Sequence, residues 1–498
     1  MATMEEAKNQ KRKWLKDSLN KVTTEPVMFL YMFAFMLTSV VEQRFYVDRA
    51  CRVDLGFSDE ICTNIASNSS EKVIVQKYVA VFVQYNTIAM HGVPLVLALF
   101  LGAWSDKNGG ARKGPLLAGL LGKTIYSVMF AVNAWQDSWP LYFSLYTATL
   151  PPALTGADLA IFMATFSYVA DVTTPEERTL RITLLQVSYL ITIPTGVALG
   201  KILFNATGES VVICFLVNAA LLVVALIYAA LRLNWRSAKR VMDTAKVVEK
   251  RKPFLCDFFD RQHLADTIRT VFRKRPGSRR AYLWGLLIAM GLYTFHRDES
   301  SLMYLYTQLT FNFDLNLYSN FRTYQSGVYV LGILCVMPIM TKVCKLPDAA
   351  AVLVGAAAHA AARVVFILAQ MPYMLYVGAT LSSLGPIVAP VIKSMVTKVV
   401  PIRDRGKVMS ILASADNAVP LFSGVVYSQV YNATITTFPQ AFFIITIAAQ
   451  LLVMAIMGGI QCSLKSGRLD DGETPPAAQV DEPLQRSPSK ASIHSVTD

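Results

Sequence analysis

RLNWRSAKRV (residues 232–241) opens and RKRPGSRRAY (residues 273–282) closes a basic segment that separates two apolar halves of the chain. Fifteen Lys and Arg residues lie between Arg232 and Arg280. Such a charge density requires water, and Lys/Arg-rich loops stay on the cytoplasmic side of a membrane. Apolar runs of about 20 residues, each long enough to cross a hydrocarbon core of about 30 Å, flank the segment. We therefore predict that residues 232–281 form a cytoplasmic linker between two membrane bundles.

The composition is typical of a membrane protein with many spans. Of the 498 residues, 54% are hydrophobic and 16% are charged, whereas soluble domains contain about 25% charged residues. The net charge of +13 comes from basic residues between the apolar runs. It therefore indicates loops that face anionic lipid and argues against a nucleic-acid partner. No cleavable signal peptide is recognisable, so the first apolar run is expected to direct insertion.

We predict an all-α membrane protein with twelve transmembrane helices. Six apolar segments precede the linker and six follow it, which gives six-helix bundles at 27–231 and 282–460. The segments are 27–47, 79–101, 114–134, 141–169, 182–204, 209–231, 282–306, 322–342, 348–369, 373–397, 406–430 and 438–460. Two halves of six helices are the layout of major facilitator transporters, which hold substrate at mid-membrane between the halves.

The charges of the loops predict the orientation. The amino terminus, 1–26, carries six Lys and Arg residues and is expected in the cytoplasm. Loops then alternate between basic sequences and sequences without Lys or Arg, which places the carboxy-terminal tail, 461–498, in the cytoplasm as well. From Gly467 the tail is rich in Pro, Ser and acidic residues, and we expect it to be disordered.

The longest predicted outer loop, between the first two segments, carries two kinds of modification site. Cys51 and Cys62 share this loop, and a disulfide between them is plausible if the loop lies outside the cytosol. All three N-x-S/T acceptors, Asn68, Asn205 and Asn432, fall on the predicted outer side. We expect glycosylation at Asn68, because the other two lie close to the membrane.

A charged turn follows the second segment. GAWSDKNGGARKG, residues 102–114, resembles the facilitator loop motif G-x-x-x-D-x-x-G-R-R. The matching residues are Gly102, Asp106 and Gly109, and the basic pair is displaced to Arg112 and Lys113. An acid beside a tight turn could hold a neighbouring helix end in one conformation only, which predicts a cytoplasmic gate. The alternative is an ordinary charged turn.

A second cytoplasmic cluster follows the fourth segment. Asp171, Arg178 and Arg181 lie within ten residues of one another there. We predict that Asp171 and Arg178 join the residues of the charged turn in the same gate.

Ionisable residues inside apolar segments are costly and therefore candidates for function. Asp158 lies near the middle of the fourth segment, in PPALTGADLAIF. A lone acid at this depth is a candidate proton carrier, and the alternative is a structural acid that bonds to a neighbouring helix. Glu42 and Arg44, late in the first segment, are predicted to form an interfacial pair.

The seventh segment carries four consecutive ionisable residues in GLYTFHRDESSLMYLY, residues 291–306. Helical spacing places His296 and Glu299 on one face, and Arg297 and Asp298 elsewhere. Because histidine titrates near neutral pH, His296 would suit a proton-sensing gate. Alternatively, the four residues mark a broken or interfacial helix end.

Two cations complete the candidate site. Arg363 lies in the ninth segment and Lys393 in the tenth. In a central cavity, both would attract an anionic substrate. Lys393 is also near the inner end of its segment, where its side chain could instead extend to the cytosol.

These stretches together resemble solute carrier family 46, the proton-coupled folate transporter family of the major facilitator superfamily, as a diverged invertebrate-type member. The resemblance covers roughly residues 25–460. It rests on EPVMFLYMFAF, GAWSD, GADLAIFMATFSYVADVTTPEERTLRITLLQ, APVIKSMVTKVVP and SGVVYSQVYNAT. It implies transport of folate-like or related organic anions, including muropeptide-like and cyclic-dinucleotide-like solutes.

The resemblance also implies roles for single residues. The family's span-four aspartate maps to Asp158, its loop aspartate to Asp106 and its span-seven histidine to His296. Its span-ten arginine falls at Lys393, which lacks the planar fork that grips carboxylates. Its span-five glutamate falls at Gln186, which we place among the substrate-binding residues with Lys393 and Arg363. Gln186 carries no proton, so we expect coupling to be absent or moved to Asp158 or Glu299.

We therefore expect a secondary active transporter of small organic anions that works by alternating access, with protons as the candidate driving ion. The rivals are an uncoupled facilitator, an exporter from an acidic organelle, and a membrane receptor without flux. The expected partners are an organic anion, protons and lipid, with no cofactor, metal site or enzymatic activity. The expected location is the plasma membrane or an endolysosomal membrane.

Overall fold

The computed structural model describes residues 22–63, 65, 69–107, 111–173, 175–235, 279–400 and 405–465. Within these ranges every regular element is a helix, which confirms the predicted fold class. The predicted disordered tail beyond residue 465, most of the predicted linker, Asn68 and Gly109 lie outside the described residues. Their predicted roles therefore remain predictions.

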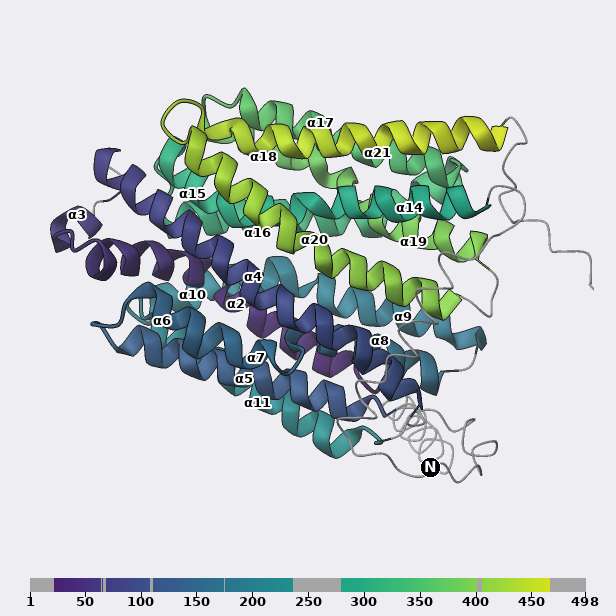
Figure 1. Cartoon of the computed structure of the whole chain (residues 1–498), viewed down its shortest axis with the longest axis horizontal. Helices are drawn as coiled ribbons and strands as arrows, with labels where there is room; N and C mark the ends of the chain where they lie inside the picture. Colours follow the sequence, from purple (N-terminus) through teal and green to yellow (C-terminus); the bar gives the residue numbers. More distant parts are fainter. Residues whose placement is uncertain are drawn as a thin grey trace, which may run out of the picture.

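The first half of the chain forms one group of helices (Figure 1). Its elements are α2 (Glu25–Arg49), η1 (Ala50–Asp54), α3 (Asp59–Thr63), α4 (Ser69–Lys107), α5 (Lys113–Trp135), α6 (Leu141–Ser144), η2 (Leu145–Thr149), α7 (Leu150–Ala153), α8 (Ala157–Val172), α9 (Pro175–Leu190), α10 (Thr192–Ala206) and α11 (Val211–Arg232). Helix α11 packs against α5 and α2, and α10 packs against α2. The contact is close at Gly200, where an added Cβ would lie 2.0 Å from the carbonyl oxygen of Leu37.

The second half forms the other group. Its elements are α14 (Arg279–Thr294), η4 (Phe295–Asp298), α15 (Glu299–Phe311), α16 (Leu315–Leu331), η5 (Gly332–Val336), η6 (Ile339–Val343), α17 (Asp348–Ile367), α18 (Pro372–Leu381), η7 (Ser382–Ile387), α19 (Val388–Val399), α20 (Arg405–Thr434), η9 (Pro439–Ala441) and α21 (Phe442–Lys465). Helix α17 lies against α21 and η7.

Helices occupy all twelve predicted segments, but fewer than twelve of them have the length and composition of a membrane span. Nine helices in the described part of the chain are long and apolar enough to span a membrane. The segments 282–306, 322–342 and 406–430 are helical but are not among the nine. Each contains several polar or charged residues. These three crossings stay predictions.

The two halves meet along α4 with α20 and α10 with α16 (Figure 1). A polar junction of five residues, Lys72, Gln76, Gln308, Asn312 and Tyr431, joins them near the predicted outer ends of the helices. Gln76 donates to the carbonyl of Leu305 at 2.9 Å and to Gln308 at 3.2 Å. Tyr431 donates to Gln76 at 2.8 Å, and Lys72 donates to the Asn312 amide oxygen at 2.8 Å. The junction explains why α4 begins ten residues before the predicted segment.

A covalent link lies in the connection between α2 and α4, where it joins η1 to α3. The structure joins Cys51 to Cys62 by a disulfide, with the Cα atoms 5.8 Å apart. Both side chains are buried, in the same apolar cluster as Phe45 and Phe82. The pair is the one that the sequence singles out, and the bond ties the end of α2 to the loop before α4.

Candidate functional site

A charged cluster lies inside the first half, where α8 begins. Helix α7 ends at Ala153, within the sequence PPALTG of residues 151–156. Gly156 then adopts a left-handed φ of +81° before α8 starts at Ala157. This break places Asp158 in the first turn of α8, where the helix dipole favours a negative charge. The Asp158 carboxylate lies 3.0 Å from the Lys123 ammonium and accepts a hydrogen bond from Tyr31 at 2.5 Å.

Asp158 is therefore not the lone acid that the sequence suggested. Lys123, on α5, is only 4% exposed and supplies the opposite charge. The alternative reading of Asp158, an acid bonded to neighbouring helices, describes its contacts, since Tyr31 comes from α2 and Lys123 from α5. Its proton-carrying role remains a prediction.

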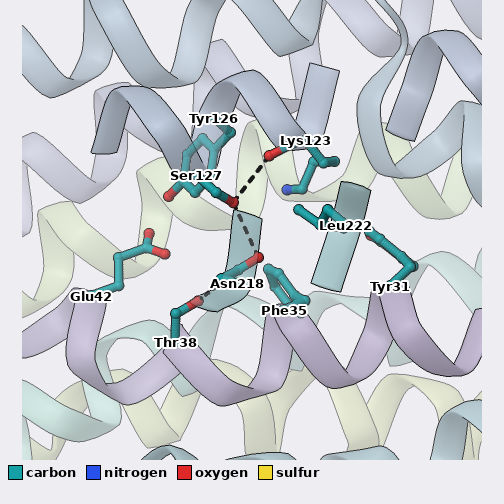
Figure 2. Close-up of a pocket in the computed structure, with 9 residues that line it drawn as sticks. All are labelled: Tyr31, Phe35, Thr38, Glu42, Lys123, Tyr126, Ser127, Asn218 and Leu222. Atoms are coloured by element: carbon teal, nitrogen blue, oxygen red, sulfur yellow. Dashed lines mark hydrogen bonds between the residues drawn. The ribbon is translucent and has the colours of Figure 1, made fainter. Parts of the chain in front are cut away.

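A pocket extends from Lys123 between α2, α5 and α11 (Figure 2). Its lining residues are Tyr31, Phe35, Thr38, Glu42, Lys123, Tyr126, Ser127, Asn218 and Leu222. Asn218 ties the walls together, because it accepts a hydrogen bond from Ser127 at 3.1 Å and donates one to Thr38 at 2.8 Å. The site is thus a polar seam inside an otherwise apolar bundle.

Glu42 lies on the wall of this pocket away from Lys123 (Figure 2). Its carboxylate accepts a hydrogen bond from Tyr46, one turn along α2. The predicted interfacial pairing with Arg44 was wrong for Glu42, because α2 turns this side chain toward the interior of the bundle. A single acidic residue near a helix end does not reveal which face is buried.

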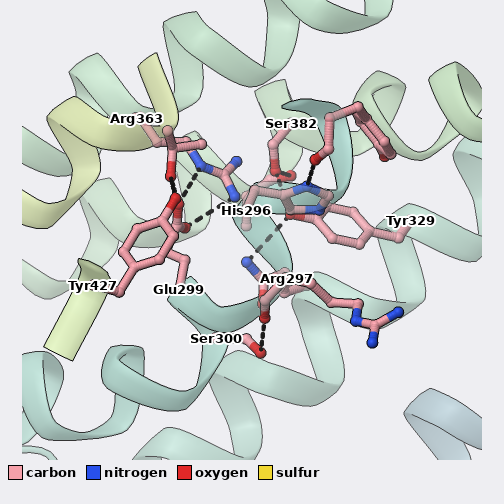
Figure 3. A network of polar contacts seen from close by, with 12 residues as sticks. His296, Arg297, Glu299, Ser300, Tyr329, Arg363, Ser382 and Tyr427 are labelled. Carbon is pink, nitrogen blue, oxygen red and sulfur yellow. Dashed lines mark hydrogen bonds and ion pairs between the residues drawn. The ribbon is translucent and has the colours of Figure 1, made fainter. Parts of the chain in front are cut away.

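The second half contains a different cluster, built around a complete ion pair (Figure 3). The Arg363 guanidinium on α17 lies 2.9 Å from one Glu299 oxygen and donates through Nε to the other at 3.2 Å. The side chains are 3% and 5% exposed. Thr446 donates to the same carboxylate. Arg363, predicted as a substrate-binding cation, and Glu299, predicted as a proton carrier, thus neutralise each other.

His296 lies one turn before Glu299, in a 3-10 turn that interrupts the seventh segment. The alternative of a broken helix therefore describes this position. The ring nitrogen Nδ1 of His296 contacts the carbonyl of Tyr293, and the ring meets His359 edge-on with centroids 4.5 Å apart. His359 is fully buried, and neither of its ring nitrogens has a hydrogen-bond partner among the described residues.

Lys393 is the more accessible of the two predicted substrate-binding cations. Its side chain is 43% exposed, and its ammonium lies 3.5 Å from Asp416 on α20. Asp416 also accepts a hydrogen bond from Thr294 at 3.1 Å. Gln186 lies on α9 and is partly buried. The structure thus leaves Lys393 as a positive group that is paired at longer range and is open on one side.

The predicted cytoplasmic gate is described in part. Arg112 forms an ion pair with Asp171 at 3.0 Å and donates to Ser105 at 3.1 Å. These contacts join the start of α5 to the ends of α4 and α8. The backbones of Gly102 and Asp106 lie in α4 and that of Arg178 in α9, but their side chains are not described.

Four residues of these clusters were missed or misread in the sequence: Glu42, Lys123, His359 and Asp416. A signal existed for Lys123, which interrupts the apolar run LLAGLLGKTIYSV at 116–128. No group of three or more His, Cys, Asp or Glu side chains in the described ranges is arranged to hold a metal ion.

Comparison with known proteins relates the sequence of this chain to transporters. The chain is 23% identical over 451 residues to a probable peptidoglycan muropeptide transporter of Drosophila melanogaster, with 85% of this chain and 82% of the relative covered. It is 25% identical over 447 residues to the proton-coupled folate transporter of Bos taurus, with 88% and 91% covered. Both belong to solute carrier family 46.

Among solved structures, the human organic anion transporter MFSD10 matches with a TM-score of 0.61 at 15% identity, covering 87% of this chain and 98% of the other. That likeness shows the fold. The family model for the Major Facilitator Superfamily matches residues 82–347, more than half of the chain. The helical halves and the sequence match agree, and the chain belongs to the Major Facilitator Superfamily.

Proposed function

We propose that this protein is a proton-driven secondary transporter of small organic anions that works by alternating access. The observation that carries the proposal is the pair of charged clusters within the two halves, at Asp158–Lys123, where the Asp158 side chain is 30% exposed, and at the buried pair Glu299–Arg363. Charged groups are kept inside a membrane bundle at a cost, and in transporters they mark substrate and proton pathways. The residues proposed to respond to protons are Asp158 and His296.

The anionic substrate class is supported by Lys393 and by the relatives. Lys393 is the half-open cation of the second half, and it would attract a carboxylate or phosphate from the cytoplasmic side. The two relatives are transporters named for a muropeptide and for folate, and the structural neighbour is an organic anion transporter. We propose that Arg112 and Asp171 form part of the cytoplasmic gate, and that the protein resides in the plasma membrane or an endolysosomal membrane.

The test is radiolabelled uptake into cells that express the chain at the surface. The probes are a reduced folate, a muropeptide and a cyclic dinucleotide, each at pH values of about 5.5 and 7.4, on either side of the unperturbed histidine pKa of about 6.5. Uptake stimulated by acid and reduced by Lys393→Met supports the proposal. Absence of flux for all three probes, with the protein detected at the surface, argues for the receptor alternative.

One observation favours a second candidate, an uncoupled facilitator. Gln186 stands where the family resemblance places a proton-coupling glutamate, and an amide carries no proton. A facilitator would move the same probe at equal rates at both pH values. The comparison of the two pH values in the wild-type protein separates the candidates.

A further inference from the structure

The two halves carry related charged residues on corresponding helices. The first predicted segment of each half carries an acid, which is Glu42 in the first half and Glu299 in the second. The third segment of each half carries a base, which is Lys123 in the first half and Arg363 in the second. Halves of major facilitator proteins are structural repeats, so the helices that carry these residues correspond. In the second half the acid and the base are joined at 2.9 Å.

The first half makes a different choice of partner. Lys123 is bonded to Asp158 of the fourth segment, while Glu42 accepts a hydrogen bond from Tyr46. Two partly buried carboxylates and the buried ammonium of Lys123 therefore lie within one bundle. The other titratable groups that face them are Tyr31, Tyr46, Tyr126 and, within electrostatic range of Asp158 and Lys123, His91 of α4.

This charge count leaves one negative charge without a cation. A charge without a counter-charge is unfavourable inside a membrane bundle, even where its side chain is only partly buried. A proton on one of the two carboxyl groups removes the imbalance. Glu299 and Arg363 need no such proton, because each neutralises the other.

The geometry also gives Lys123 a route toward Glu42. Both side chains line the same pocket (Figure 2). The Lys123 ammonium lies 5.2 Å from the ring of Phe35 and 4.9 Å from the ring of Tyr126, and both rings line the pocket as well. Cations are stabilised over aromatic faces, so these rings support the ammonium at intermediate positions. A lysine has a flexible stem that permits such a movement.

We propose that Glu42 is a proton-binding residue of the transport cycle and that Lys123 alternates between Asp158 and Glu42 as Glu42 gains and loses its proton. This rests on the proposed function and names its coupling group. Uptake forms one O–H bond at Glu42 with a proton from the acidic side, while Lys123 stays with Asp158. Release breaks the same bond to water on the other side, and Lys123 then moves between the two carboxylates. Glu42 thus provides a group that can carry a proton, which the amide of Gln186 cannot do.

The first experiment measures coupling and carrier movement separately. Wild type, Glu42→Gln and the matched control Glu42→Asp are compared with whichever of the three probes the wild type transports. Glu42→Gln is expected to lose the acid stimulation of net uptake, to a ratio of about one, while exchange of external for internal probe continues. Glu42→Asp is expected to keep most of the stimulation. Acid stimulation that is unchanged in Glu42→Gln overturns the proposal.

The second experiment does not depend on transport. Infrared difference spectra of the purified wild type, recorded between acidic and neutral pH, are expected to contain the carbonyl band of a protonated carboxylic acid. The band should be lost in Glu42→Gln and kept, at a shifted frequency, in Glu42→Asp. If no probe is transported but the Glu42 band is present, the proposed function fails while the proton site stands. Identical spectra for wild type and Glu42→Gln exclude the proton site.

Discussion

The charged clusters of the two halves show how one arrangement of residues can serve as a brace or as a movable element. In the second half, the planar fork of Arg363 holds both oxygens of Glu299, and Thr446 donates to the same carboxylate. In the first half, the point charge of Lys123 pairs with Asp158 and lies near the rings of Phe35 and Tyr126. Arginine suits fixed bidentate pairing, whereas the flexible stem of lysine lets its ammonium reach several positions. The difference suggests that the second half anchors and the first half responds.

The largest expected effect comes from breaking the brace. Glu299→Gln leaves the Arg363 guanidinium buried without its counter-charge, which costs about 3–5 kcal/mol of stability. Thermal unfolding of the detergent-purified protein should show a large fall in Tm. The double variant Glu299→Gln with Arg363→Gln removes both charges and should recover part of the loss. An unchanged Tm in the single variant would mean that the pair is not a brace.

The corresponding change in the first half should affect stability less and pH dependence more. Asp158→Asn frees Lys123, which has Glu42 as a second partner across the pocket. We expect a loss of stability of about 1–2 kcal/mol, below the range for a buried pair left uncompensated, together with loss of acid-stimulated uptake. A loss as large as that of Glu299→Gln would contradict the difference between the halves.

A third prediction concerns the substrate side of the second half. Lys393→Met should raise the KM for an anionic probe by about tenfold, since a hydrogen bond to a charged group contributes about 1.5–3 kcal/mol. Lys393→Arg is the control that keeps the charge. The measurement is concentration-dependent uptake at fixed pH. Equal KM values for all three proteins would remove Lys393 from the proposed binding site.

The smallest effect is expected where a pair faces solvent. Lys398 and Asp348 form an ion pair at 3.1 Å, with side chains 42% and 28% exposed. Lys398→Gln should change the stability by less than about 1 kcal/mol, because water screens such pairs. Thermal unfolding beside Glu299→Gln checks this ranking. A larger effect than in Glu299→Gln would show that burial does not decide the strength of these pairs.

The helices were predictable because apolar runs long enough to cross a bilayer are a local property of the sequence. The start of α4 was not, since Lys72 and Gln76 read as loop residues but are buried by bonds to the other half. The charge partners were equally hidden. Lys123 and Asp158 are 35 residues apart, and Glu299 and Arg363 are 64 apart. Only the packing of helices decides such pairings.

The polar junction at the outer ends of the helices has a consequence for how easily the two halves separate. The acceptors in its hydrogen bonds are amide and carbonyl oxygens, and water can take their place as partners of the donors when the halves separate. A neutral hydrogen bond contributes about 0.5–1.5 kcal/mol net and one from a charged donor such as Lys72 about 1.5–3 kcal/mol, so the bonds of the junction hold the closed state by several kcal/mol. A ligand that prefers one state by about 5.5 kcal/mol inverts a population ratio of about 99 to 1. The binding energy of one substrate molecule is therefore of the right size to exchange the populations of the open and closed states.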